Sequence, residues 1–116
     1  MADIQNTATA ASRVELFRTE IPETNDRELV MFLLTLPPGG AAPIHKHPGV
    51  GIGYVLEGVY ESQYEGEPLK RFAAGEAIYD LQDTPHLIAR NASSTEPLRF
   101  TMTFVVRKGQ PTILPL

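Results

Sequence analysis

Three histidines, the only ones in the chain, have a spacing that could bind one metal ion: His45, His47 and His86. His45 and His47 are two positions apart, so both rings project from the same face of an extended strand. His86 follows the turn-forming sequence Asp83-Thr84-Pro85 and opens a second apolar run, which an antiparallel sheet can bring beside the first pair. Neutral imidazole is a common ligand of divalent first-row metals. Spacing alone leaves this interpretation open, because histidines also occur without ligand roles on surfaces and in cores.

The composition excludes several other kinds of chemistry and partner. The 116 residues suit one domain, and the absence of cysteine excludes disulfides, thiolate nucleophiles and cysteine-based metal sites. The net charge of −4 and the scattered basic residues indicate no nucleic-acid partner. No segment has the features of a signal peptide or the length to span a bilayer, so we expect no membrane partner and a cytoplasmic location. No serine stands in a nucleophile motif, so any catalysis should depend on the metal.

Short β-strands are expected to position the histidines. The 10 prolines and 9 glycines divide the chain into segments that are too short for helices of usual length. The expected strands are 27–36, 52–56, 59–64, 69–72, 77–81, 86–90 and 98–106, and Glu57-Gly58 indicates a hairpin between the second and third. Roughly eight antiparallel strands in one domain at 13–116, after a flexible N-terminal arm at 1–12, predict an all-β fold. The expected architecture is a single antiparallel β-barrel or jelly roll.

Two motifs around the histidines resemble those of the cupin family. The first runs through Gly39, His45-Lys46-His47, Gly51 and Gly58, and the second runs from Gly75 through Thr84-Pro85-His86 to Asn91. Together they cover 39–91, about half of the chain. The resemblance is to a small single-domain cupin, the type-2 conserved barrel. It implies that His45, His47 and His86 bind one divalent transition metal per chain, which could be Fe, Mn, Zn, Ni or Cu.

The chain departs from the first motif at Gly51, where the family usually has a glutamate ligand. Three neutral imidazoles leave the double charge of an ion uncompensated, which favours a small anionic or chelating substrate. Water is the simplest replacement ligand, because Glu57 is expected at an exposed turn and neither Glu61 nor Gln63 has the motif's position. Gly51→Glu is then expected to restore a fourth ligand and tighten metal binding. The alternative is a decayed site that binds metal poorly.

Other side chains are candidates for the surroundings of the ion. Asp80 and Asp83 could orient the His86 ring, although an aspartate before Thr-Pro more often caps a turn. The remaining candidates for the pocket or for support of the ligands are Gln63, Tyr54, Asn91, Met102 and Phe104. The basic candidates for holding an anionic substrate are Lys46, Arg90 and Arg99.

Two classes of function fit the resemblance. The first is a metal-dependent enzyme, either a dioxygenase that cleaves a chelating substrate or a lyase or isomerase that uses the ion as a Lewis acid. The second is a non-catalytic cupin module that binds or senses a metal and a small ligand. We favour the enzyme because an open metal position inside an apolar pocket is reactive. The apolar segments 27–36 and 100–106 exceed what one interior can bury, so we expect a homodimer, as cupins commonly form.

Overall fold

The computed structural model describes residues 12–116, and these residues form ten β-strands and no helix. The strands are β1 (Ser12–Glu20), β2 (Arg27–Leu36), β3 (His45–Lys46), β4 (Gly51–Glu57), β5 (Val59–Tyr64), β6 (Lys70–Ala73), β7 (Ala77–Asp80), β8 (His86–Asn91), β9 (Leu98–Arg107) and β10 (Leu114–Pro115). Each of the seven predicted strands is present with its ends within one residue of the prediction. The predicted arm at 1–12 lies outside the described residues except for Ser12, which begins β1. Over 12–116, no helix has the length and apolar character needed to cross a membrane.

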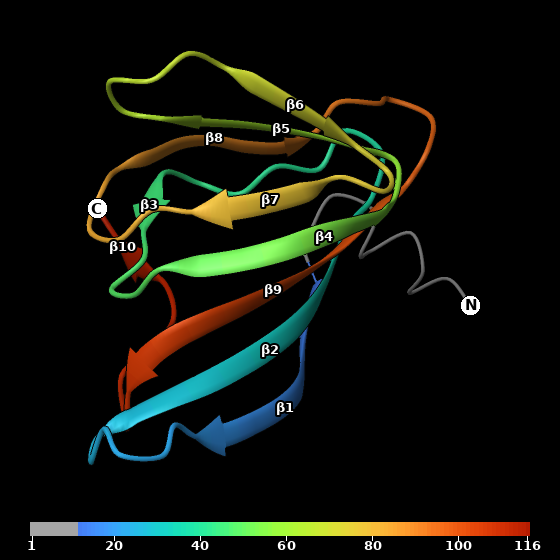
Figure 1. The fold of residues 1–116 in the computed structure, drawn as a ribbon. Helices are drawn as coiled ribbons and strands as arrows, with labels where there is room; N and C mark the ends of the chain where they lie inside the picture. Colours follow the sequence, from blue (N-terminus) through green and yellow to red (C-terminus); the bar gives the residue numbers. More distant parts are fainter. Residues whose placement is uncertain (1–11) are drawn as a thin grey trace.

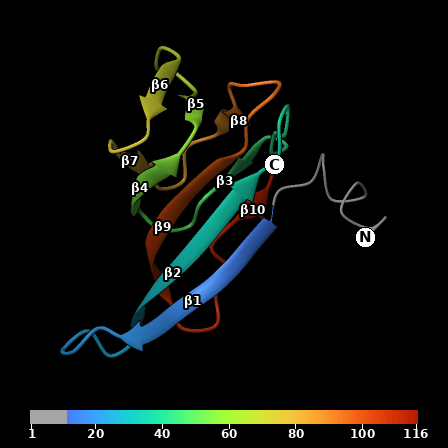
Figure 2. The ribbon, with the colours of Figure 1, turned by 90° about the vertical axis from the view of Figure 1, so that its right-hand side faces the viewer.

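The strands form two five-stranded antiparallel sheets that lie as two layers (Figure 1). One sheet has the order β1-β2-β9-β4-β7, and the other has the order β10-β3-β8-β5-β6. Figure 2 shows β1 at the edge of the first sheet, beside β2. The all-β jelly roll is therefore confirmed, although the two sheets stay separate and do not close into one continuous barrel.

Consecutive strands β4 and β5 lie in different sheets, so the hairpin predicted at Glu57-Gly58 is wrong. β4 pairs with β7 and β9, whereas β5 pairs with β6 and β8. Only Gly58 separates them, and its φ of 88° lies in the left-handed region that favours glycine. A Cβ at this position would lie 2.5 Å from the Pro97 carbonyl oxygen. Gly58 therefore turns the chain from one sheet into the other.

The core lies between the two sheets and is built mainly on β9. Its alternate residues Leu98, Phe100, Met102, Phe104 and Val106 are all buried. Strict alternation fixes the register of this strand, because a slip of one residue would turn the whole apolar set outward. The paired strands β2 and β4 are held in the same way, so β9 determines which residues of β4 face the interior.

Candidate metal centre

The second sheet brings the three histidines together. His45 on β3 is the register partner of His86, the first residue of β8. His47 follows two positions later and forms an isolated bridge with Gln82. One nitrogen from each ring lies within 4.8 Å of the others, and all three residues are buried. An antiparallel pairing therefore places His86 beside the His-x-His pair, as the sequence predicted.

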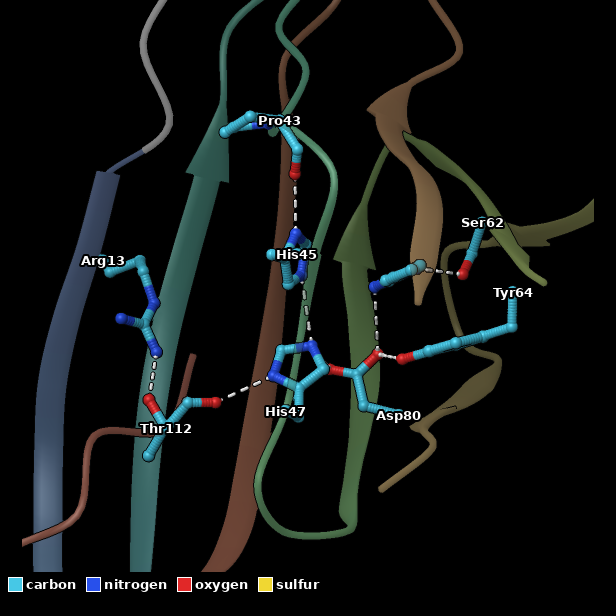
Figure 3. Close-up of polar contacts among 9 residues, drawn as sticks. Arg13, Pro43, His45, His47, Ser62, Tyr64, Asp80 and Thr112 are labelled. Carbon is cyan, nitrogen blue, oxygen red and sulfur yellow. Dashed lines mark hydrogen bonds and ion pairs between the residues drawn. The ribbon is translucent and has the colours of Figure 1, made fainter. Parts of the chain in front are cut away.

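Backbone carbonyl groups determine which nitrogen of His45 and His47 faces the cluster. Nδ1–H of His45 donates to the Pro43 carbonyl oxygen at 2.7 Å, and Nδ1–H of His47 donates to the Thr112 carbonyl oxygen at 2.8 Å (Figure 3). A carbonyl oxygen only accepts, so the proton of each neutral ring is on Nδ1. Each Nε2 therefore presents a lone pair to the other histidines.

His86 is turned the other way round. Its Nε2 lies 2.7 Å from Ser62 Oγ, while its Nδ1 is buried without a hydrogen-bond partner among the residues of 12–116. A proton on Nδ1 would leave a buried donor unsatisfied, which is costly. The proton therefore belongs on Nε2, which donates to Ser62, and Nδ1 presents a third lone pair to the cluster.

These three lone pairs fit a divalent metal ion. Nε2 of His45 and Nε2 of His47 are only 3.2 Å apart, a distance at which two lone pairs repel unless a cation lies between them. In metal sites, each ligating histidine characteristically donates its other N–H to an oxygen. All three rings have that arrangement, with Pro43, Thr112 and Ser62 as the acceptors.

The protonation state of the rings also suits a metal. Burial, together with the neighbouring His45 and His47, lowers the pKa of His86 to about 3. Burial likewise lowers the pKa of His45, although the hydrogen bond to Pro43 opposes the shift. These two rings are therefore neutral at pH 7, the form that binds a metal.

Asp80 adds a buried carboxylate to the cluster. Its Oδ2 lies 3.3 Å from His47 Nε2, and its Oδ1 lies 3.8 Å from His86 Nδ1. The Tyr64 hydroxyl donates to Oδ1 at 2.5 Å (Figure 3). Burial raises the pKa of Asp80, while His47 and the Tyr64 hydrogen bond act against this rise. The sequence had suggested Asp80 only as a residue that orients His86, yet it contacts two of the rings.

A cavity beside the cluster lies between the sheets. Its volume is about 70 Å³, measured as the space that the centre of a water molecule can occupy. This is room for several waters or a small ligand. Its apolar wall contains Leu34, Leu36, Ala42, Ala89, Phe100, Met102, Phe104 and Ile113. Its polar residues are His45, His47, His86, Asp80, Tyr60 and Arg13. Met102 and Phe104 were among the pocket candidates.

The other pocket candidates, Tyr54, Gln63 and Asn91, lie outside the cavity wall. Tyr54 is exposed on β4, because alternate residues of that strand face outward. Gln63 donates to the Glu67 carbonyl oxygen. The amide of Asn91 donates to three backbone carbonyl groups and accepts from the Ser93 amide, so it holds a loop. Asp83, which had been considered beside Asp80, is exposed in the turn before β8.

Arg13 is the basic residue of the cavity wall, in place of the candidates Lys46, Arg90 and Arg99. Arg90 pairs with Glu61, and Arg99 pairs with Glu57. Arg13 lies on the exposed edge strand β1, and its register partner Leu34 also lines the cavity. The Arg13 guanidinium lies over the Phe32 ring, with 4.2 Å between Cζ and the ring centroid. Arg13 Nη2 donates to Thr112 Oγ1 at 2.5 Å. No motif surrounds Arg13, so its place in the cavity wall could not be predicted from neighbouring residues.

The chain belongs to the cupin family, because the cupin domain of that family matches residues 32–106. The matched segment contains all three histidines and Asp80. No curated protein matches the chain.

Three solved structures illustrate the fold that the chain shares. The DMSP lyase DddQ from Ruegeria pomeroyi DSS-3 has a TM-score of 0.69 and 21% identity, over 90% of this chain and 51% of that one. An oxalate oxidase in complex with glycolate has a TM-score of 0.69 and 22% identity, over 92% of this chain and 55% of that one. The polyketide cyclase RemF from Streptomyces resistomycificus has a TM-score of 0.65 and 22% identity, over 91% of this chain and 70% of that one. The chain thus spans about half the length of the first two, and at these identities the likeness concerns the fold alone.

Proposed function

We propose that the protein binds one divalent transition metal ion through His45, His47 and His86 and uses it to act on a small anionic or chelating compound. The observation that carries the proposal is the buried His86 Nδ1, which has no hydrogen-bond partner within the described residues and faces the lone pairs of the other two rings. When bound, such an ion supplies Lewis-acid polarisation of a substrate oxygen or activation of a chelated substrate toward dioxygen. The enzymes among the solved structures of this fold support a catalytic role.

The cavity supports a small substrate that carries a negative charge. A guanidinium group can bind a carboxylate through two parallel hydrogen bonds. Arg13 places its guanidinium group in the cavity wall. Partial burial lowers the pKa of Arg13, against the effect of Asp80, but an arginine in a protein stays protonated. The proposed substrate places its anionic group at Arg13 and its apolar part against the aliphatic wall, with a donor atom toward the histidines.

Elemental analysis and activity assays test the proposal on the intact protein. We expect about one transition metal ion per chain in protein purified from its native host. After anaerobic loading, oxygen uptake with diketones, catechol-like acids or thiols would identify a dioxygenase. Turnover of aldehydes, cyanohydrins or sugar acids without oxygen uptake would identify a lyase or isomerase. A protein that binds metal and is stabilised by a small ligand without turnover would be a binding module.

Arg13→Gln should weaken the binding of small dicarboxylates without loss of metal. A hydrogen bond to a charged group contributes about 1.5–3 kcal/mol, so we expect the affinity for oxalate or malonate to fall by roughly 10- to 100-fold. Isothermal titration of the metal-loaded protein measures this effect. The matched control is Arg18→Gln on the same strand, where the arginine pairs on the surface with Glu15 and Glu28. Equal affinities for wild type and Arg13→Gln would exclude Arg13 from the substrate site.

The proposed assembly is a homodimer. The outer face of the first sheet carries exposed apolar side chains, among them Val14, Phe17, Ile52 and Tyr54. Contact with a second copy would remove this apolar surface from water.

A further inference from the structure

We infer that Asp80 is a fourth protein ligand of the metal and that it supplies, from β7, the carboxylate that Gly51 does not supply from β4. This inference rests on the proposed three-histidine site and adds a ligand that the family's first motif does not contain. It is carried by the crowding around Gly51, the register between β4 and β7, and the orientation of the Asp80 carboxylate.

The position of the usual glutamate is filled by an aromatic ring. Gly51 is the register partner of Phe104 on β9. A Cβ on residue 51 would lie 2.6 Å from two atoms of the Phe104 ring and 3.2 Å from Met102 Cε. The same Phe104 ring stacks on His47, with 4.8 Å between the ring centroids. A side chain at residue 51 would therefore have to displace the ring that packs against a proposed ligand.

The strand on the other side of β4 provides a carboxylate instead. β7 pairs with β4 so that Asp80 lies directly opposite Gly51. Residues directly opposite each other in an antiparallel pair project from the same face of the sheet, with Cβ positions about 5 Å apart. Moving an acidic residue from position 51 to position 80 therefore keeps its side chain on the inner face, beside the histidines.

Tyr64 holds the Asp80 carboxylate in an orientation that suits a ligand. The Tyr64 ring stacks on the His86 ring, with 4.0 Å between the ring centroids, and the Tyr64 hydroxyl donates to Asp80 Oδ1. Oδ2 is left facing His47 Nε2 at 3.3 Å (Figure 3). Two atoms bound at about 2.1 Å to one ion are about 3.0–3.4 Å apart at octahedral or tetrahedral angles. The separation of Oδ2 from His47, and that of His47 from His45 at 3.2 Å, both fall in this interval.

A metal ion would also compensate the charge of Asp80. This carboxylate is only 5% exposed, and a buried carboxylate is costly without a cation beside it. A divalent ion at the histidines would provide that cation. Asp80 would in turn cancel one unit of the ion's charge and leave Arg13 as the counter-charge for an anionic substrate.

Asp80→Asn tests this inference, with Asp83→Asn as the matched control. Asp83 undergoes the same chemical change three residues away, on the surface. Both variants and the wild type are titrated with Co²⁺, and binding is followed by the visible absorption bands, which respond to the ligands of the ion. Loss of a supporting group near a metal usually weakens affinity by about 10- to 100-fold. We expect Asp80→Asn to weaken the Co²⁺ affinity by more than about 100-fold and to change the absorption bands. The Co²⁺ affinity of Asp83→Asn should stay within about threefold of the wild-type value.

Unchanged Co²⁺ affinity in Asp80→Asn would overturn the assignment, and so would weaker binding with unchanged bands, because Asp80 would then act from outside the ligand set. If Asp80→Asn does not fold, Asp80→Glu retains the charge but moves the oxygen atoms. We expect it to bind Co²⁺ with altered bands, and unaltered bands would contradict the inference.

The proposed function is tested separately: if wild type binds Co²⁺ and His86→Ala does not, only the role of Asp80 is in question. No binding by wild type would overturn both proposals.

Discussion

His86→Ala should leave the protein without a bound transition metal. The substitution removes the nitrogen that completes the cluster, and it leaves Ser62 Oγ without the partner that now lies 2.7 Å away. His86 is only 1% exposed, so truncation also creates a cavity, and we expect a loss of about 2–4 kcal/mol in the free energy of unfolding. Elemental analysis measures the metal, and circular dichroism with urea unfolding measures the fold and its stability.

Two further variants make the result for His86 specific. Leu87→Ala changes the next residue, which is exposed, and should retain both metal and stability. His86→Gln keeps most of the side-chain volume and should also lose the metal, which separates ligation from packing. Full metal content in a folded His86→Ala protein would show that the ion is bound elsewhere or through other residues.

Acid unfolding of the metal-free protein provides a second readout for His86. The pKa of a histidine in an unfolded chain is about 6.5, whereas burial lowers the pKa of His86 in the folded protein to about 3. The unfolded state therefore takes up a proton in this interval that the folded state does not. Stability should fall as the pH drops from about 6.5 toward 3, and more steeply in wild type than in His86→Ala. The lowered pKa of His45 acts in the same direction in both proteins.

Much of this architecture follows from local sequence. Prolines and glycines delimit the strands, and alternation on β9 identifies the core face. The spacing of the histidines, together with the cupin motifs, predicted that they would meet. The outward position of Tyr54 could also have been read from the sequence. If residue 51 faces the interior, then residue 54 on the same strand faces outward, as it does.

Positions that depend on pairing between distant strands could not be read in this way. Asp80 enters the site through the register of β7 against β4, and no residue near Asp80 specifies that register. Arg13 reaches the cavity through the pairing of β1 with β2, which contains an irregularity between Glu15 and Phe17. Gly58 is a residue type typical of a hairpin turn. Only the strands that pair with β4 and β5 show that it connects two different sheets. In each case the deciding contact is made by residues far apart in the chain.

Gly51→Glu should destabilise the protein and weaken metal binding, which reverses the expectation drawn from the family motif. The added Cβ would meet the Phe104 ring at 2.6 Å, and overpacking of a core commonly costs about 1–3 kcal/mol. The carboxylate would also enter an apolar wall, so we expect a total loss of about 2–4 kcal/mol in the free energy of unfolding. Because Phe104 stacks on His47, its displacement should also move a proposed ligand and lower the metal affinity.

Two single variants separate the sources of this effect. Gly51→Ala introduces only the Cβ, and Gly51→Gln adds nearly the full side chain without its charge. If crowding dominates, Gly51→Gln and Gly51→Glu should lower the free energy of unfolding in urea by similar amounts, and both should lower the Co²⁺ affinity. A Gly51→Glu protein that binds Co²⁺ more tightly than wild type would show that the Phe104 ring yields easily, and the original expectation would then stand.

The double variant Gly51→Glu/Phe104→Ala removes the obstruction and gives the sharper test. Phe104→Ala alone should cost about 3–5 kcal/mol, because it empties a buried position. If residue 51 and Phe104 compete for the same space, the double variant should be at least about 1 kcal/mol more stable than the sum of the single effects predicts. Its glutamate would then have room to approach the histidines, so its Co²⁺ affinity should exceed that of Gly51→Glu. Additive stability effects with no recovery of affinity would mean that Phe104 does not exclude a ligand at position 51. The absence of a carboxylate there would then need a cause other than the packing of β9 against β4.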